Sequence, residues 1–316
     1  MISPQLVHYA AAIFTLAIAV LGGGIGQGLA SLAAINAIQR QPCSYTANFR
    51  ALMIGLALIE SGIVIALVTS LLIIFGTQTI TLGSALGEFG IAFAIGISGG
   101  TVSIASSRVV QAATESIGRQ PFFAQKITSV MLLAQSIMEA PVIIAFIISL
   151  LIRNRISSDP DVMRGLQCLA AGLTIGLGSI GPSIGQAIFT RAACRGIGVN
   201  KTAYNKIFPF MLLLEAIIET PLIFCLLISF MILYRPLDGG NLSDIAILIS
   251  SAFAVGLGSL GSATGIGLTA SKGVESIASN PEHYSIILRT TLLIVAFVES
   301  SMIYAMIVAL MLVMKT

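Results

Sequence analysis

The chain has 316 residues, of which 56% are hydrophobic and only 9% are charged, and its mean hydropathy is +1.00. Soluble domains carry about 25% charged residues, so a chain of this size could not cover its surface in water. The composition therefore excludes a soluble enzyme and indicates an integral membrane protein. The net charge of +3 gives no reason to expect a nucleic-acid partner.

Eight apolar segments follow one another along the chain, each longer than the roughly 20 residues that cross a bilayer core. They form four pairs: 6–35 with 49–75, 86–113 with 124–152, 165–190 with 206–234, and 245–271 with 284–314. Membrane-barrel strands need only about 9–11 residues and alternate in polarity, so they do not fit. The first segment lacks a basic leader and a small-residue cleavage site, which predicts a retained span. We expect an all-α membrane protein with eight transmembrane helices in four tandem hairpins.

Basic residues gather in the loops inside the pairs and beside them, where eleven of the sixteen lie. They are Arg40, Arg50, Arg108, Arg119, Lys126, Arg191, Arg195, Lys201, Lys206, Lys272 and Arg289. By the positive-inside rule these short loops are cytoplasmic, or on the matrix or stromal side of an organelle membrane, and both termini lie on the opposite side.

The pairs repeat at a nearly constant spacing along the chain. The loop Arg40-Gln41-Pro42 recurs as Arg119-Gln120-Pro121, as Val199-Asn200-Lys201 and as Ser279-Asn280-Pro281. We therefore expect four hairpin domains, at 1–80, 81–158, 159–239 and 240–316.

One carboxylate falls at the same distance after the loop position in every repeat: Glu60, Glu139, Glu219 and Glu299. An acid in the middle of a membrane costs about 2.5–3.5 kcal/mol, and burial favours its neutral form. Such a group can carry a proton or a small cation through lipid and ionise when it meets water or a fixed positive charge. We expect these four residues to bind the ion, with no intramembrane Lys or Arg to pair with them. For a single Glu, a purely structural carboxyl is the alternative.

Small residues alternate along the first helix of each pair. In the first repeat they are Gly22, Gly24, Gly26 and Gly28, and the same positions are small in the second and third repeats and in the fourth. Small residues let helix backbones approach closely in lipid. The pattern predicts a tightly packed inner layer of helices.

Together, the Arg-Gln-Pro loop, the glycine-alternating helix and the Glu at a fixed position after the loop proline resemble the c subunit of the F-type ATP synthase rotor. The resemblance covers essentially the whole chain as four tandem hairpins, whereas the usual c subunit is one hairpin. Fused hairpins are also similar to the proteolipids of V-type and archaeal ATPases. The family implies self-association into a ring in membrane lipid, with the glycine-rich helices inside and the Glu-bearing helices outside, in a bacterial inner membrane or an organelle inner membrane.

The resemblance further implies a non-catalytic, ion-translocating protein without a cofactor. Each Glu would take up an ion from one half-channel of the a-type stator subunit and release it at the other, which couples rotation to ATP synthesis. The hairpin loops would contact central stalk subunits of the γ and ε type through Arg40, Gln41, Pro42, Arg119, Gln120 and Pro121. The chain has no phosphate-binding loop of the GxxxxGK[ST] kind, so ATP would be handled by partners.

The transported ion is H⁺ or Na⁺, and no fixed metal is expected. Sodium-type members of the family carry a Gln in the first helix and a hydroxyl after the Glu, because a hard cation needs several oxygen ligands. The possible auxiliary ligands are Gln27, Ser61, Gln186, Glu215, Thr220 and Ser300. The second repeat breaks the pattern with Ser106 and Ala140, and the fourth with Ile266. All four carboxyls can bind a proton, which favours H⁺. Sites in this family form between adjacent hairpins, so Gln27 could serve a neighbour's Glu.

Glu215 lies one turn before Glu219, where the second repeat has Gln135. It could form a coupled acid pair that strengthens a cation site. Equally, it could replace Gln135 as a protonated hydrogen-bond partner.

The remaining polar residues are expected to be structural. His8 and His283 lie near span ends, which predicts solvated positions, and Glu88 falls in a linker between pairs. The four cysteines have no metal-site spacing and are expected to be free. Bends are expected at four prolines: Pro141, Pro182, Pro209 and Pro221.

A cation or drug exchanger of small helical units is the alternative from another functional class. It would need aromatic substrate cavities, yet the chain has no Trp, its aromatic content is 7%, and an exchanger does not require one Glu per hairpin. A non-catalytic scaffold of packed hairpins is opposed by the same four aligned carboxylates.

Overall fold

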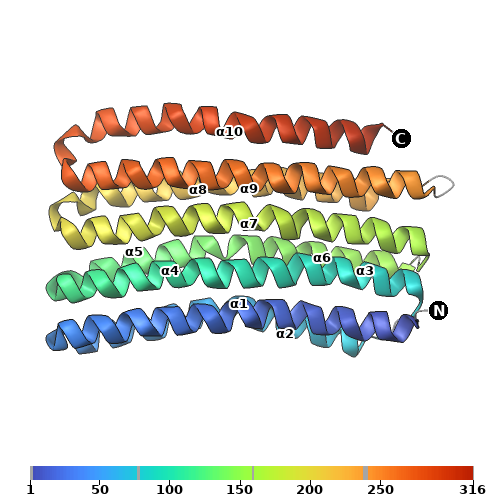
Figure 1. Cartoon of the computed structure of the whole chain (residues 1–316), viewed down its shortest axis with the longest axis horizontal. Helices are drawn as coiled ribbons and strands as arrows, with labels where there is room; N and C mark the ends of the chain where they lie inside the picture. The colour runs from blue at the N-terminus through green and yellow to red at the C-terminus, as the bar shows by residue number, and fades with distance from the viewer. Residues whose placement is uncertain (1–2, 77–78, 159, 238–240, 316) are drawn as a thin grey trace.

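The computed structural model describes residues 3–76, 79–158, 160–237 and 241–315, and these residues form long helices (Figure 1). The helices are α1 (Pro4–Arg40), α2 (Tyr45–Ile74), α3 (Leu82–Ala92), α4 (Ser98–Arg119), α5 (Ala124–Met138), α6 (Ala140–Ser158), α7 (Val162–Val199), α8 (Tyr204–Tyr234), α9 (Leu242–Ser279) and α10 (Tyr284–Met314). A π-helical turn, Phe93–Ile97, joins α3 to α4. Within the described residues, eight helical rods are long and apolar enough to cross a membrane, which confirms the predicted all-α fold.

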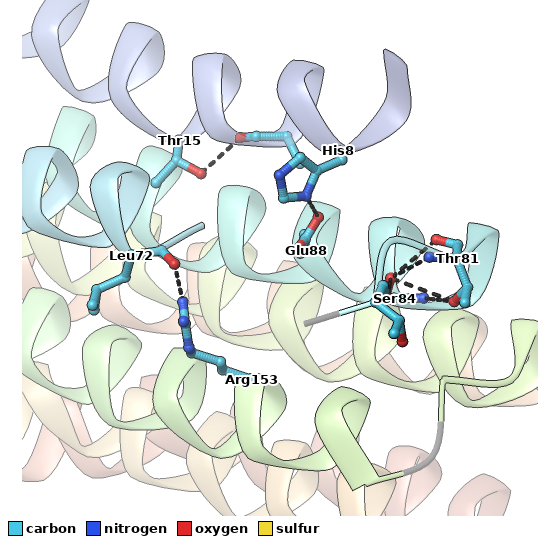
Figure 2. Close-up of polar contacts among 9 residues, drawn as sticks. His8, Thr15, Leu72, Thr81, Ser84, Glu88 and Arg153 are labelled. Carbon is cyan, nitrogen blue, oxygen red and sulfur yellow. Dashed lines mark hydrogen bonds and ion pairs between the residues drawn. The ribbon is translucent and has the colours of Figure 1, made fainter. Parts of the chain in front are cut away.

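Local capping chemistry sets where the rods begin. Ser3 accepts a hydrogen bond from the backbone of Leu6 at 3.3 Å, and Asp161 accepts one from the backbone of Met163 at 3.1 Å. Thr81 and Ser84 form a reciprocal capping box at the start of α3 (Figure 2).

Every hairpin turns through one 3₁₀ turn at the predicted loop position. The turns are Pro42–Ser44, Pro121–Phe123, Lys201–Ala203 and Pro281–His283. Their positions confirm the loop alignment of the third repeat, where no proline marks the turn. Both chain ends lie at the end of the bundle opposite these loops (Figure 1).

The helices form two layers, and the hairpins follow one another in chain order (Figure 1). We call α1, α3–α4, α7 and α9 the glycine-rich layer, since these helices pack directly on one another. The carboxylate layer contains α2, α5–α6, α8 and α10, which carry the four predicted ion-binding residues. Helices of the carboxylate layer also contact the glycine-rich helix of the next hairpin, as α2 does with α4 and α8 with α9.

Small residues produce the close approach within the glycine-rich layer. A methyl group at Gly22 would overlap the backbone of Gly100, and one at Gly26 would lie 2.7 Å from the carbonyl oxygen of Ser103. Gly24, Gly28 and Gly261 instead have open space where a methyl group would be. Only part of the alternating pattern therefore serves contacts inside the chain.

The expected solvated position of His8 and linker position of Glu88 are wrong. Both residues are buried, and Nδ1 of His8 on α1 lies 2.7 Å from Oε2 of Glu88 on α3 (Figure 2). Arg153 of α6 donates to the carbonyl oxygen of Leu72 nearby. The cause is packing between hairpins, because α1 and α3 lie against each other near their first turns and each buries the polar side chain of the other.

Two arginines expected beside the loops lie well inside helices. Arg108 lies about three helical turns before the end of α4, and Arg191 lies about two helical turns before the end of α7. The loops Pro121–Phe123 and Lys201–Ala203 come after these helix ends. Both positions lie in the half of their rod that is nearer the hairpin loop. In the described part of the chain neither arginine pairs with a predicted ion-binding residue, because both lie on the face of their helices that is turned away from the carboxylate layer.

Among the four prolines, only Pro141 coincides with an interruption. α5 ends at Met138 and α6 begins at Ala140, because Pro141 has no N–H to donate to the preceding turn. Pro182, Pro209 and Pro221 lie inside uninterrupted helices. Of the four cysteines, Cys43 is exposed and the other three are buried.

Candidate ion-binding site

The four repeated carboxylates all lie in the carboxylate layer, in the middle of their rods. Glu60 is about 27 Å along the helix from the loop proline, near the middle of the 33-residue rod Pro42–Ile74. Glu60 is exposed, Glu219 and Glu299 are half-buried, and Glu139 is buried at the break between α5 and α6.

Glu139 shows how a site is assembled from two hairpins. The Ser61 side chain, on α2 of the first hairpin, interacts with the Glu139 carboxyl of the second. The Ser61 hydroxyl donates to the carbonyl oxygen of Leu58 at 2.7 Å. The carboxyl of one hairpin and the hydroxyl of the other therefore meet at this boundary, and their oxygens can help to hold a proton or a small cation.

Gln135, one turn before Glu139, makes hydrogen bonds to both hairpins at the same boundary. Its Nε2 donates to Oγ of Ser106 at 2.6 Å and to the carbonyl oxygen of Gly55 at 3.2 Å. Ser106 occupies the position where the first and third repeats have Gln27 and Gln186. The second hairpin thus places its amide on the outer helix instead of the inner one.

The third hairpin contains a fully buried acid, Glu215, between α7 and α8. Thr190 of α7 donates a hydrogen bond to Oε1 of Glu215, and Gln186 and Glu219 face the same carboxyl. Within the described residues, Oε2 of Glu215 and both amide atoms of Gln186 have no hydrogen-bond partner. Because buried polar atoms need partners, this cluster suits a carboxyl that carries a proton or holds a cation.

The other expected ligands lie on α1, α8 and α10. Gln27 is half-buried on α1, and Ser300 on α10 donates to the carbonyl oxygen of Phe297 at 2.7 Å. Thr220 on α8 is 3.5 Å from the carbonyl oxygen of Ala216.

Most of the expected stalk-contact residues are exposed, whereas Gln120 and Pro121 are half-buried. Arg40, Gln41, Pro42 and Arg119 are exposed. Nε2 of Gln120 donates to the carbonyl oxygen of Gly198 in the next hairpin at 3.0 Å, while Pro121 opens the turn. Gln120 therefore joins two hairpins, a contact that the loop motif alone does not reveal.

The sequence patterns also miss two hydroxyls next to the carboxylates. Ser103 of α4 donates to the carbonyl oxygen of Ile59, the residue before Glu60, at 2.9 Å. Thr190 stands four residues after Gln186, so the i, i+4 spacing of polar residues on α7 is the available signal.

The chain is similar to known proteins of one kind. The sequence pattern of the ATP synthase C subunit family matches it four times, at residues 10–73, 89–152, 169–232 and 249–312. An ATP synthase c subunit of Dehalococcoides mccartyi is 45% identical over 69 residues, which are 22% of this chain and 91% of the relative. One from Chloroflexus aurantiacus is 39% identical over 70 residues, 22% of this chain and 92% of the relative.

The four matches follow one another at the same spacing as the loop motifs, and each contains one of the mid-rod carboxylates. The eight apolar rods make the protein an integral, multi-pass membrane protein. The chain belongs to the ATP synthase C subunit family, as four tandem copies of the family's hairpin.

Proposed function

We propose that this chain is a component of a rotor ring that carries H⁺ across the membrane on Glu60, Glu139, Glu219 and Glu299, and couples ring rotation to ATP synthesis. The observation that supports this most is one mid-rod carboxylate in every family repeat, all in the same helix layer. A protonated carboxyl is neutral and can face lipid at low cost, whereas an ionised one needs water or a positive charge.

The partners follow from this role. Copies of the chain associate into a ring in lipid, the a-type stator subunit delivers and receives the protons, and γ- and ε-type stalk subunits contact the loops. The exposed side chains of Arg40 and Arg119 suit such a contact. The loops face the cytoplasm of a bacterium and the termini face the opposite side, in keeping with the basic residues of the loops.

The hairpin units of this rotor are 1–80, 81–158, 159–239 and 240–316. Each contains one family match, and the first boundary lies in the turn before α3. The boundaries at 158/159 and 239/240 touch residues outside the described part of the chain.

The register between hairpins supports H⁺ over Na⁺. Ser61, which follows Glu60, lies beside Glu139 of the next hairpin. Along the repeat, this register pairs Glu219 with Ala140 and Glu299 with Thr220. Among the described residues, no site inside the chain then combines the inner-helix Gln, the Glu and a following hydroxyl, which is the ligand set of the sodium-type pattern. A proton needs only the carboxyl.

Sodium remains a specific alternative at the seam between two copies. There the same register would bring Ser300 of one copy to Glu60 and Gln27 of the next, which is the full sodium-type set. Glu60 is exposed in the single chain, as a seam residue would be.

Carbodiimide labelling read by peptide mass spectrometry tests the proposal, with coupled ATP hydrolysis measured in the same membranes. We expect modification at the four mid-rod carboxylates, loss of coupled hydrolysis, and less labelling as the proton concentration falls. The exposed Glu275 is the internal control, because carbodiimide prefers a protonated carboxyl in an apolar setting. Protection by Na⁺ at constant pH would establish the sodium alternative, and full activity after labelling would exclude the rotor role.

A further inference from the structure

A groove lies between α4 and α7 on the face opposite the ion-binding carboxylates. Its cavity has a volume of about 460 Å³. Isoleucines line its length, with Arg108 from α4 and Arg191 from α7. Ser106 faces α5, and successive helical residues turn by about 100°, so Arg108 points to the opposite side.

The groove carries more positive charge than its surroundings neutralise. Arg191 has Arg108 and Arg195 as charged neighbours, together with the acid Glu115. Oε2 of Glu115 lies 3.0 Å from Nη2 of Arg195, so this acid is already engaged with one of the three cations. Nε of Arg191 is buried and, within the described residues, makes no hydrogen bond.

The two arginines stand near the level where lipid headgroups begin. A rod of 38 residues is about 57 Å long, so it extends about 13 Å beyond each side of a bilayer core of about 30 Å if it is centred. Arg191 is about 15 Å and Arg108 about 20 Å from the loop. Arg191 therefore stands close to the edge of the core and Arg108 about one turn inside it, where a long arginine side chain can snorkel toward the headgroups.

We propose that this groove binds an anionic phospholipid, with the phosphate between Arg108 and Arg191 and an acyl chain along Ile104, Ile184 and Ile188. Arginine forms forked hydrogen bonds with phosphate, and basic pockets between transmembrane helices suit anionic headgroups. A lipid matches both parts of the groove, because its acyl chain can pack against the isoleucines and its headgroup can bind the two arginines. A free phosphate would match only the cations.

The other hairpins lack this combination of residues. The positions equivalent to Arg108 hold Leu29, Ile188 and Leu268, and those equivalent to Arg191 hold Leu32, Gln111 and Ser271. The boundary between the second and third hairpins is thus expected to hold one lipid per chain. This proposal rests on membrane insertion and not on the rotor role.

Native mass spectrometry of the intact protein tests the site after equilibration with vesicles of phosphatidylglycerol or of phosphatidylcholine. We expect one phosphatidylglycerol per chain and at least about tenfold weaker retention in the double variant Arg108→Leu with Arg191→Gln, since two charge-assisted contacts are lost. These substitutions copy residues that other hairpins carry at the same positions. Arg119→Gln, at the exposed end of α4, is the matched control and should retain the lipid.

Three results would overturn the proposal: equal retention by the double variant, equal retention of phosphatidylcholine, or displacement of the lipid by millimolar inorganic phosphate. The charge-preserving variant Arg108→Lys with Arg191→Lys guards against a folding defect, because it should keep most of the binding. Carbodiimide labelling of the same samples reports on the ion-binding carboxylates separately, so failure of the groove and failure of the rotor role remain distinguishable.

Discussion

Glu215 and Gln135 occupy equivalent positions in neighbouring hairpins, and both are fully buried. Gln135 bonds with Ser106, and Glu215 accepts from Thr190. A protonated carboxyl has one donor and one acceptor side, as an amide does, whereas an unpaired buried carboxylate is very costly. Glu215 therefore suits the role of a neutral hydrogen-bonding group better than that of a travelling charge.

Replacing Glu215 by Gln should change the free energy of unfolding by less than about 1 kcal/mol, because the amide reproduces the donor and acceptor pair. Denaturation with SDS in mixed micelles measures this quantity. Glu215→Ala is the comparison. It should lower the free energy of unfolding by about 2–3 kcal/mol, because it leaves a cavity and removes the polar partner of Thr190 and Gln186. Similar losses in both variants would show that Glu215 holds a cation that Gln cannot.

Thr190→Val should lower the free energy of unfolding by about 1–3 kcal/mol, since it leaves a buried carboxyl oxygen without its donor. Thr174→Val is the matched control on the same helix. Among the described residues, its hydroxyl donates to the carbonyl oxygen of Ala170 within α7, at 2.8 Å, so its loss should cost less. Equal effects in the same SDS titration would contradict a special role for the Thr190 contact.

At the scale of single residues, the sequence predicts what repeats and misses what occurs once. Glu60, Glu139, Glu219 and Glu299 are recognisable because a costly residue returns at one spacing. The contact of Thr190 with Glu215 exists in one hairpin, and a lone threonine in a helix carries no such signal. Hydrogen-bond partners depend on the rotation and register of adjacent rods, which hydropathy does not encode.

Among structural elements, the glycine-rich helices contain glycines of two kinds: some pack against the next helix, and others have no neighbour within the described part of the chain. Gly22 packs against the backbone of Gly100, while Gly24, two residues later, meets nothing inside the chain. The alternation predicts small-residue packing, but not which neighbour each face receives.

Gly22→Ala should therefore destabilise the chain by about 1–3 kcal/mol, because the methyl group overlaps backbone that cannot move without separating two helices. Gly24→Ala should be neutral or stabilising by up to about 1 kcal/mol in the isolated chain, since alanine favours helix. Thermal unfolding of the detergent-solubilised monomer compares the two. A larger loss at Gly24 would contradict the packing of α1 on α4.

The buried His8–Glu88 pair joins α1 to α3 at the end opposite the hairpin loops. Glu88→Ala should cost about 1–3 kcal/mol in SDS titration, because His8 keeps its burial and loses its partner. The control is Glu275→Ala, which removes an exposed pair with Lys272 at 3.0 Å and should cost at most about 1 kcal/mol. If both changes proved equally mild, the pair would not contribute to joining the helices.

Helix number, pairing and loop positions follow from the sequence, because each rests on about 20 or more residues of consistent hydropathy. Rod ends do not, and hydropathy also does not show that His8 and Glu88, near two of these ends, are buried against each other. Caps such as Ser3 and Thr81 extend the helices into segments of lower hydropathy.

At the scale of the whole molecule, the described residues leave an edge without a packing partner at each terminal hairpin. Gly24 and Gly28 lie open on α1 and Gly261 lies open on α9. In the interior, the residue equivalent to Gly24 is Ser103, whose carbonyl oxygen lies against Gly26 of the preceding hairpin. The first edge therefore has the form of a surface that receives the last hairpin of another copy.

Gly24→Leu should prevent assembly without unfolding the chain, because a large side chain fits in open space but not in a close helix contact. Native mass spectrometry should give multiples of the 32.9 kDa chain for the unmodified protein and the single chain for the variant. Leu21→Ala, at an exposed position of the same helix, serves as a size-reducing control. A variant that still forms the full assembly would place the seam elsewhere.

Covalent fusion of the hairpins also changes how substitutions are inherited. In a ring of identical separate hairpins, a mutation that introduces a second buried acid or a groove arginine appears at every position at once, and its cost is multiplied around the ring. In this chain Glu215 and Arg108 each occur in one hairpin of four, so one mutation alters a quarter of the positions and leaves the others as templates. Tandem fusion therefore lets the sequences of neighbouring hairpins diverge while every hairpin keeps its mid-rod carboxylate.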